Sequence, residues 1–263
     1  TITVHNPLFL MRTPSRFLLL PLLTALLILG CSPEKEELQV ETIPQYLPLQ
    51  AGKFITYRLD SLVFTQAGRG EETHYYEEKN IVDAQIADNL GRPAYRVFRY
   101  LRDTSRTQAW RPSGSYFITP LENSAEVIED NMRVIKLVAP IAEGKTWKGN
   151  RFLTSEPFGA KFNFSNDDAM GDWDFITEST QDTEKFGSQL LNNVITITSI
   201  DESLNAPVRD AGAYGARTFS TEKFAKGIGS VYQEFIMWEY QPNSGGTPYK
   251  VGFGVKRSMI DHN

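Results

Sequence analysis

The sequence holds a cluster of carboxylates whose spacing could bind a hard cation. The stretch NDDAMGDWD at 166–174 is the densest acidic patch of the chain, and carboxylate and carbonyl oxygens are the ligands that Ca²⁺ takes. The spacing departs from that of an EF-hand loop, because Met170 occupies a ligand position and no glutamate stands at the twelfth. We therefore expect a solvated loop that leads into a strand at Trp173, with a calcium site as the alternative. That site would use Asp167, Asp168, Asp172 and Asp174.

A basic stripe crosses one strand-like run of this acidic chain, at Arg92, Arg96, Arg99, Arg102 and Arg106. Alternate side chains of a strand share a face, so Arg99 points to the face opposite Arg96 and Arg102. Guanidinium and aromatic groups together suit a carboxylated or phosphorylated ligand, or an acidic partner. We favour the simpler interpretation, in which the arginines pair with acids such as Glu77 and Glu78 on a neighbouring strand. The candidate ligand-binding set is Arg96, Phe98, Tyr100 and Arg102.

Known catalytic motifs are poorly matched. The GKT at 144–146 lacks the glycine that a phosphate-binding loop needs five residues earlier, where Ala139 stands. After residue 30, His74 and His262 are the only histidines, and no Gly-x-Ser-x-Gly elbow is present. A pair of carboxylates for glycoside hydrolysis can be chosen in almost any acidic chain. A glycan-active or other hydrolytic enzyme is therefore an alternative, and we expect no catalytic residue.

The only cysteine, Cys31, stands between an apolar run and an acidic cluster. Met11, two arginines and the apolar run 17–29 have the order of a secretory signal peptide, and the run is too short for a membrane-spanning helix. The residues at 28–31, ILGC, resemble the lipobox of bacterial lipoproteins. In that family the thiol is joined to diacylglycerol and the chain is cut before the cysteine. The resemblance implies that Cys31 is lipidated and anchors the protein to a membrane.

These features divide the chain into segments. Charge with proline cannot pack a core, so the acidic stretch SPEKEE at 32–37 is expected to be part of a solvated tether. An acidic cluster behind the lipid cysteine also resembles the export signal of surface lipoproteins in the Bacteroidetes. We therefore expect an outer-membrane position, on the cell surface rather than the periplasmic face. The predicted segments are 1–10, upstream of the natural start; 11–30, the signal peptide; 31–45, the tether; and 46–263, a β-rich body with possible sub-units 46–139 and 140–263.

Charge and cysteine content exclude several functions. Residues 31–263 keep all 32 acidic residues and lose two of the 27 basic ones, a formal net charge of −7. Nucleic-acid binding rests on neutralising phosphates with Lys and Arg, so we expect no nucleic-acid partner. With Cys31 lipidated no thiol is left, which excludes an intramolecular disulfide and a zinc–thiolate site.

Aromatic and β-branched residues dominate the body in short runs broken by Gly, Pro, Asn and Asp, as in β-strands. In FITYRLDSLVF at 54–64, Ile55, Tyr57 and Leu59 alternate with polar residues. The best short helix is Thr218–Ala225. We predict a mainly β fold of antiparallel sheets, barrel-like or a sandwich, with little helix. The other predicted strands are 73–86, 95–102, 107–111, 116–119, 132–138, 172–178, 194–200, 230–240 and 249–260.

One motif occurs twice. PLQAGKF at 48–54 recurs as PIAEGKT at 140–146. Proline suits the edge or start of a strand, and glycine permits a tight turn before the next one. Two interpretations stay open: a pair of duplicated β units, or two uses of one common turn.

Three fragments of the body are similar in order and spacing to motifs of uncharacterised Bacteroidetes outer-membrane lipoproteins. They are YLPLQAGKFITYRLDS at 46–61, IKLVAPIAEGKTWKGN at 135–150 and FAKGIGSVYQEF at 224–235. The family forms read PLxxGKxxxY, GKTWxGN and AKGxGxVYxE. The resemblance implies a lipid anchor and a β-rich fold, and it implies no activity and no catalytic residue.

We therefore expect a lipid-anchored outer-membrane protein with a non-catalytic binding or accessory role toward an envelope protein or a glycan. A carrier of an apolar ligand inside a curved sheet is the second hypothesis. The first predicts a filled core, and the second predicts a lined cavity. No cofactor is expected apart from a calcium ion at the acidic patch.

Overall fold

The computed structural model describes residues 1, 3, 41–165 and 169–263. Cys31, the expected signal peptide and most of the expected tether lie outside the described residues, as do Asp167 and Asp168. The described residues from 41 onward make one compact unit, which carries all the helical turns and strands of the described ranges. In these ranges no helix is long and apolar enough to cross a bilayer.

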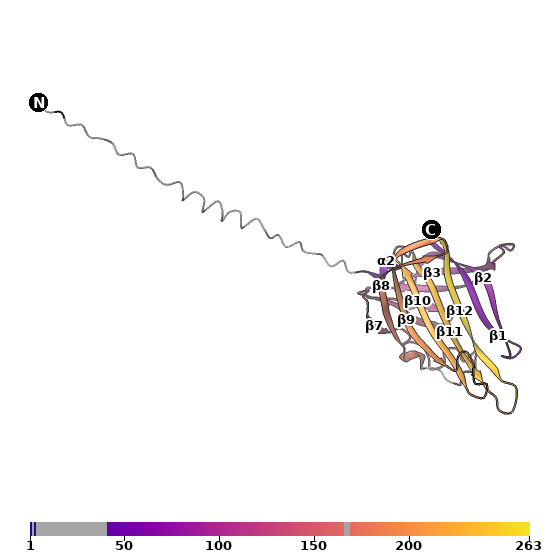
Figure 1. Ribbon diagram of the computed structural model, residues 1–263. Helices are drawn as coiled ribbons and strands as arrows, with labels where there is room; N and C mark the ends of the chain where they lie inside the picture. The colour runs from indigo at the N-terminus through magenta and orange to yellow at the C-terminus, as the bar shows by residue number, and fades with distance from the viewer. Residues whose placement is uncertain (2, 4–40, 166–168) are drawn as a thin grey trace. The chain divides into compact units, whose positions relative to one another are not determined.

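Twelve strands form a single antiparallel sheet (Figure 1). Each strand pairs with its neighbours in the chain, except that β6 does not pair with β7, and β1 also pairs with β12. The order is therefore β6-β5-β4-β3-β2-β1-β12-β11-β10-β9-β8-β7. The strands are β1 Phe54–Thr65, β2 Gly70–Ala87, β3 Pro93–Asp103, β4 Arg111–Pro120, β5 Ser124–Glu129, β6 Met132–Val138, β7 Thr146–Lys148, β8 Asp174–Phe186, β9 Gln189–Leu204, β10 Gly215–Ala225, β11 Gly229–Gln241 and β12 Tyr249–His262. A helical turn, α2 Ile43–Tyr46, precedes them, and a 3-10 turn, η1 Met170–Asp172, precedes β8.

The sheet curves until its two end strands meet, which makes it a nearly closed barrel. Across the seam between β6 and β7, the Ile135 amide donates to the Gly149 carbonyl at 2.8 Å. The Trp147 indole Nε1–H donates to the Ile135 carbonyl, also at 2.8 Å. Closure leaves few unpaired edge groups, the usual way in which antiparallel sheets avoid open edges. The predicted mainly β, barrel-like fold with little helix is confirmed.

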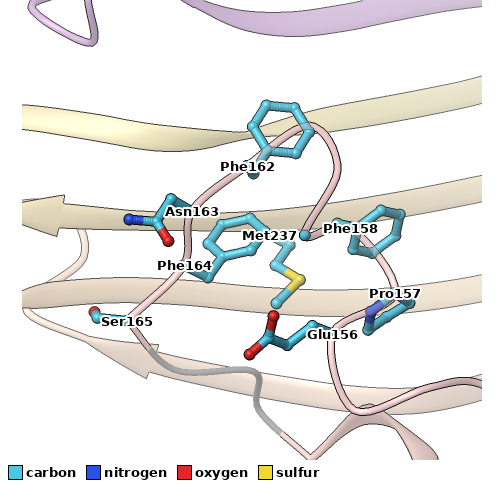
Figure 2. Close-up of a pocket in the computed structure, with 9 residues that line it drawn as sticks. Glu156, Pro157, Phe158, Phe162, Asn163, Phe164, Ser165 and Met237 are labelled. Atoms are coloured by element: carbon cyan, nitrogen blue, oxygen red, sulfur yellow. The ribbon is translucent and has the colours of Figure 1, made fainter.

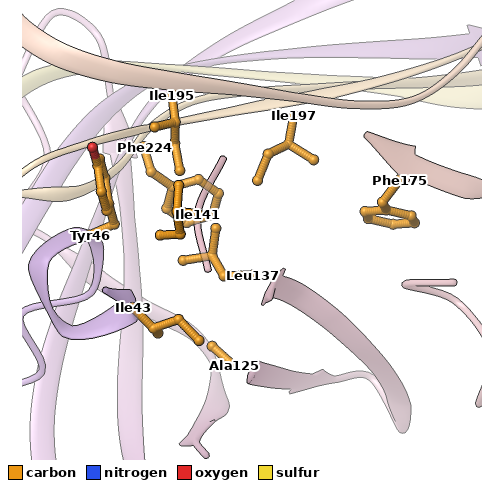
Figure 3. Close-up of a cluster of buried hydrophobic side chains, with 9 residues drawn as sticks. All are labelled: Ile43, Tyr46, Ala125, Leu137, Ile141, Phe175, Ile195, Ile197 and Phe224. Carbon is orange, nitrogen blue, oxygen red and sulfur yellow. The ribbon is translucent and has the colours of Figure 1, made fainter. Parts of the chain in front are cut away.

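One end of the sheet is filled by an apolar cluster that α2 closes (Figure 3). Ile43 and Tyr46 of α2 are 2% and 0% exposed and pack with Leu137, Ile195 and Phe224. The Thr42 amide donates to the Gln45 side-chain oxygen at 2.8 Å and so holds the start of the turn. Burial raises the pKa of Tyr46 to about 12. This end is therefore a packed core.

Two elements predicted from the sequence are wrong. The predicted helix Thr218–Ala225 is part of β10, because β9 and β11 pair with it on both sides and its Thr and Phe residues suit a strand. The predicted strand 107–111 is largely a loop, since the Asp103 carboxylate accepts hydrogen bonds from the amides of Thr107 and Gln108, at 3.0 and 2.7 Å. Strands β5 and β7 were not predicted, and they are only six and three residues long.

The repeated motif makes the same turn at both of its positions. The amides of Gly52 and Gly144 donate to the carbonyls of Val82 and Thr177, each at 2.8 Å, and the amides of Val82 and Thr177 donate back to Lys53 and Lys145. Both glycines have positive φ, 88° and 76°, which glycine adopts at little cost. The first copy precedes β1 and the second precedes β7, so each opens six consecutive strands. This agrees with sub-units 46–139 and 140–263, and duplication stays a prediction.

Candidate functional site

A cavity of about 450 Å³ lies inside the curved sheet, next to the packed core. Inward side chains of β3, β5, β6, β8, β10, β11 and β12 form its walls, and the segment 150–165 between β7 and β8 covers it. Ligand cavities have volumes of about 300–1,000 Å³. The cavity is thus large enough for one small molecule, which makes it the candidate binding site of the barrel.

The type of residue at the inward-facing positions changes along each strand. On β12 the inward-facing residues, read from the core toward the start of the strand, are Met259, which is 0% exposed, then Arg257, Val255 and Phe253. On β11 the core residue Val231 is followed by Gln233 and Phe235, which pair across with Arg257 and Val255. Because side chains of one strand face alternate in steps of two residues, the interior has an apolar core, then a charged layer, then an aromatic layer. The cavity lies between the charged and the aromatic layers.

Arginine–glutamate pairs make up most of the charged layer. Arg257 binds both carboxylate oxygens of Glu78, through Nε at 2.9 Å and Nη2 at 3.1 Å, and its Nη1 donates to Gln233 at 2.7 Å. Arg99 lies 3.4 Å from Glu78 through Nε and contacts Glu129 through Nη1 at 2.5 Å. Glu78 is 1% exposed. A carboxylate this deep is stable only with charged partners, and the two arginines supply them.

A lysine completes the charged layer from the other side of the barrel. Lys136 Nζ on β6 contacts Glu222 Oε2 on β10 at 2.7 Å, and the Ser230 hydroxyl donates to Glu222 Oε1 at 2.9 Å. This contact links strands near opposite ends of the sheet order. The layer therefore ties the barrel together across its interior.

Electrostatics favour the ionised forms of Arg99, Arg257 and Glu129. Burial acts to lower the pKa of Arg99 and Arg257, but the carboxylates of Glu78 and Glu129 outweigh it, and both arginine pKa values are raised. Burial also opposes ionisation of Glu129, and the charge and hydrogen bond of Arg99 outweigh it, so its pKa is lowered. Burial raises the pKa of Tyr116, which stays neutral beside them. The cavity thus has a charged floor at neutral pH.

Aromatic rings form the opposite side of the cavity. Phe162 stacks on Phe253 with centroids 5.1 Å apart, and Phe158 meets Phe253 edge-on at 5.0 Å. Phe235 lies 5.5 Å from Phe253 and 6.4 Å from Trp173. Such ring pairs stabilise the fold by more than the burial of their apolar area alone. Phe158 and Phe162 belong to the covering segment, so the rings attach that segment to the strands.

A second, smaller pocket of about 300 Å³ lies on the covering segment itself (Figure 2). Its lining includes Phe158, Phe164 and Met237, together with Glu156 and Ser165 (Figure 2). Met237 is 2% exposed and packs against Trp173 in the apolar cluster beneath the segment. The pocket offers no charged layer comparable to that of the larger cavity.

The ligand-binding set proposed from the sequence lies outside the cavity. Arg96 pairs with Asp83 at 2.5 Å and covers Phe98 at 4.9 Å from the ring centroid. Arg102 pairs with Glu77 at 2.5 Å and covers Trp110 at 4.2 Å. Glu77 lies directly opposite Arg102 in the register of β2 and β3. Arg96 and Arg102 thus pair with acids of the neighbouring strand, as the favoured interpretation predicted. Tyr100 lies on the same strand and does not line the cavity.

The acidic patch at 166–174 is only partly described. Asp174 pairs with Lys148 Nζ at 3.0 Å, and the same Nζ donates to the Asp172 carbonyl at 2.5 Å. Within 41–165 and 169–263 no three His, Cys, Asp or Glu side chains are grouped to hold a metal ion. Asp167 and Asp168 lie outside the described residues, so the calcium site stays a hypothesis.

Sequence reasoning named Glu78 as a partner for the arginines, as the structure has it with Arg99, but it proposed no binding site at the charged layer. It placed Arg99 on the face opposite Arg96 and left it unused, although that face is the interior. Arg257 stands in a β12 run whose alternate residues are Phe253, Val255 and Met259. A cation in an otherwise apolar series was the signal that identifies an inward charge. No protein-family model, curated protein or solved structure matches this chain.

Proposed function

We propose that this chain is a lipid-anchored binding protein that holds a small amphipathic ligand in the cavity of its barrel. The observation that carries the proposal is the two-sided cavity, with Arg99, Arg257 and Lys136 on one side and Phe162, Phe253 and Trp173 on the other. Of the two non-catalytic hypotheses drawn from the sequence, the hollow interior supports the carrier over the filled binding module.

The anchor in this proposal is Cys31. Its support is the lipobox-like sequence, and stable membrane attachment by lipid needs more than one acyl chain, which diacylglycerol plus an acylated amine would supply. Changing Cys31 to Ala should move the protein from the membrane fraction to the soluble fraction. A Cys31→Ala protein that sediments fully with membranes would remove the anchor from the proposal.

An apolar fluorescent dye, N-phenyl-1-naphthylamine, tests the binding site. The body 41–263 is used, since it lies within one compact unit. Dye fluorescence should rise on binding, and Ser220→Trp should weaken the dye affinity at least tenfold, because Ser220 lines the cavity on β10. Ser258→Trp is the matched control, since Ser258 pairs with Arg58 on the outer face.

Two results would count against the carrier. The first is an absence of dye binding by a folded wild-type body. The second is equal dye affinity for the wild type and the folded Ser220→Trp variant, which would place the dye outside the cavity. Thermal unfolding of each variant establishes that it is folded.

A further inference from the structure

We propose that the ligand is a single-chain anionic amphiphile, bound with its carboxylate or phosphate group against Arg99, Arg257 and Lys136 and its chain between the aromatic rings. This inference rests on the proposed function and adds the sign of the ligand's charge, its orientation and its size.

The sign of the charge on the cavity wall favours an anion. The wall holds four cations, Arg99, Lys136, Lys161 and Arg257, and two acids, Glu129 and Asp130. Lys161 and Asp130 lie 3.5 Å apart at the exposed rim, where both are about two-thirds exposed and nearly cancel. The deeper wall therefore has three cations and one acid, although the whole chain carries a net charge of −5.

The balancing carboxylates stand behind the cations. Glu78 and Glu222 neutralise Arg257 and Lys136, yet neither lines the cavity. A ligand therefore meets the positive groups first. Charges interact more strongly in a partly buried site than in water, and an anionic group there gains from all three cations. A cationic group would meet only Glu129, which Arg99 already contacts.

The cations also keep donors that their ion pairs do not use. A guanidinium has five N–H donors and an ammonium has three. Arg99 contacts Glu129 through Nη1 and lies 3.4 Å from Glu78 through Nε, so its Nη2 takes no part in either pair. Among the described residues Lys136 makes one ion pair, with Glu222. Arginine and lysine donors left over from these pairs suit the several acceptor oxygens of a carboxylate or a phosphate.

Orientation and size follow from the layers. The charged layer adjoins the packed core, whereas the aromatic layer adjoins the covering segment that carries Phe158 and Phe162. An amphiphile therefore satisfies both layers only with its anionic end inward and its chain toward the segment. A volume of about 450 Å³ is in the lower half of the range for ligand sites, which favours one chain over two.

Displacement of N-phenyl-1-naphthylamine by four twelve-carbon probes tests the sign of charge. The probes are dodecanoate, monododecyl phosphate, dodecanol and dodecyltrimethylammonium, all below their micelle concentrations and at one ionic strength. We expect dodecanoate or monododecyl phosphate to bind at least tenfold more tightly than dodecanol, and dodecyltrimethylammonium no more tightly than dodecanol. The two anions separate a carboxylate site from a phosphate site. Acetate and inorganic phosphate, which have no chain, should displace no dye.

Matched variants locate the charge. Lys136→Met should reduce the preference for the anionic probe over dodecanol at least fivefold, because only the anionic probe loses a partner of opposite charge. Lys256→Met, on the outer face of β12, should leave both affinities unchanged. Arg99→Gln provides a second inward variant if the loss of the Lys136–Glu222 contact prevents folding.

The outcomes separate the inference from the function on which it rests. Equal affinity for dodecanoate, monododecyl phosphate and dodecanol, or a preference for the cationic probe, overturns the anionic ligand and leaves a carrier. If inorganic phosphate displaces the dye as strongly as monododecyl phosphate does, the inference that the ligand is an amphiphile is overturned. If the protein binds neither the dye nor dodecanol, the proposed function itself is overturned.

Discussion

Arg257 on β12 and Glu78 on β2 are joined by two hydrogen bonds across the inside of the barrel, although β1 lies between their strands. The bonds are 2.9 and 3.1 Å long, one to each carboxylate oxygen. The two residues are 179 positions apart in the chain. The pair therefore fixes the relative positions of the first and last parts of the sheet, in the layer that the proposed ligand would contact.

Breaking this pair should destabilise the fold strongly. Arg257→Met leaves Glu78, 1% exposed, without its two-bond partner, and removing one partner of a buried pair costs about 3–5 kcal/mol. The double variant Arg257→Met with Glu78→Gln should recover part of the loss, because no buried charge is left without that partner. Urea unfolding of the body gives both values. Lys256→Met, on the outer face, is the control, and an Arg257→Met cost no larger than that of the control would contradict the prediction.

Gly252 should tolerate no side chain. Its φ is +127°, and a Cβ there would lie 2.1 Å from the Met237 carbonyl oxygen and 2.6 Å from the Trp238 Cα. Both neighbours are backbone atoms of the paired strand β11, so they cannot move aside without breaking the ladder. Gly252→Ala should cost at least about 2 kcal/mol, in the range of overpacked sites. Gly245→Ala, where a Cβ meets open space, should cost less than about 1 kcal/mol; similar costs for both would disprove the steric argument.

Acid should destabilise the fold partly through Glu129. Burial opposes its ionisation, but Arg99, Arg257 and Lys136 facing it lower its pKa below the ordinary 4.5, with Tyr116 as the neutral neighbour. The unfolded chain then takes up a proton first as the pH falls. The stabilisation is therefore complete above about pH 4.5 and is lost as the pH falls through the lowered pKa.

The check is the unfolding midpoint in urea between pH 7 and pH 3. Glu129→Gln should show a shallower loss of stability in acid than the wild type. Glu122→Gln, an exposed acid on the loop after β4, should match the wild-type slope. A Glu129→Gln slope identical to the wild-type slope would mean that Glu129 has no part in the acid dependence.

Period-two alternation predicted the strands well because it depends only on local pattern. The run 132–138 matches β6 at both ends, and the runs beginning at 54 and 249 match the first residues of β1 and β12. The site could not be predicted in the same way. Which face of β3 is interior depends on the pairing of β1 with β12, a contact between distant parts of the chain. Alternation separated Arg99 from Arg96 and Arg102, and only the closure of the sheet shows that Arg99 is the inward one.

The covering segment should open more often when its polar attachment to β11 is removed. Glu239, 3% exposed, accepts hydrogen bonds from the Ser165 amide at 2.8 Å, the Ser165 hydroxyl at 2.7 Å and the Gln241 amide at 3.0 Å. Glu239→Ala removes these acceptors, and segments held by few contacts open locally while the rest stays folded. Trypsin should then cut after Lys161, 67% exposed, several times faster than in the wild type. Glu234→Ala on the same strand, bonded only to Tyr232 in the described part, should leave the rate unchanged; equal rates in all three proteins would show that Glu239 does not hold the segment.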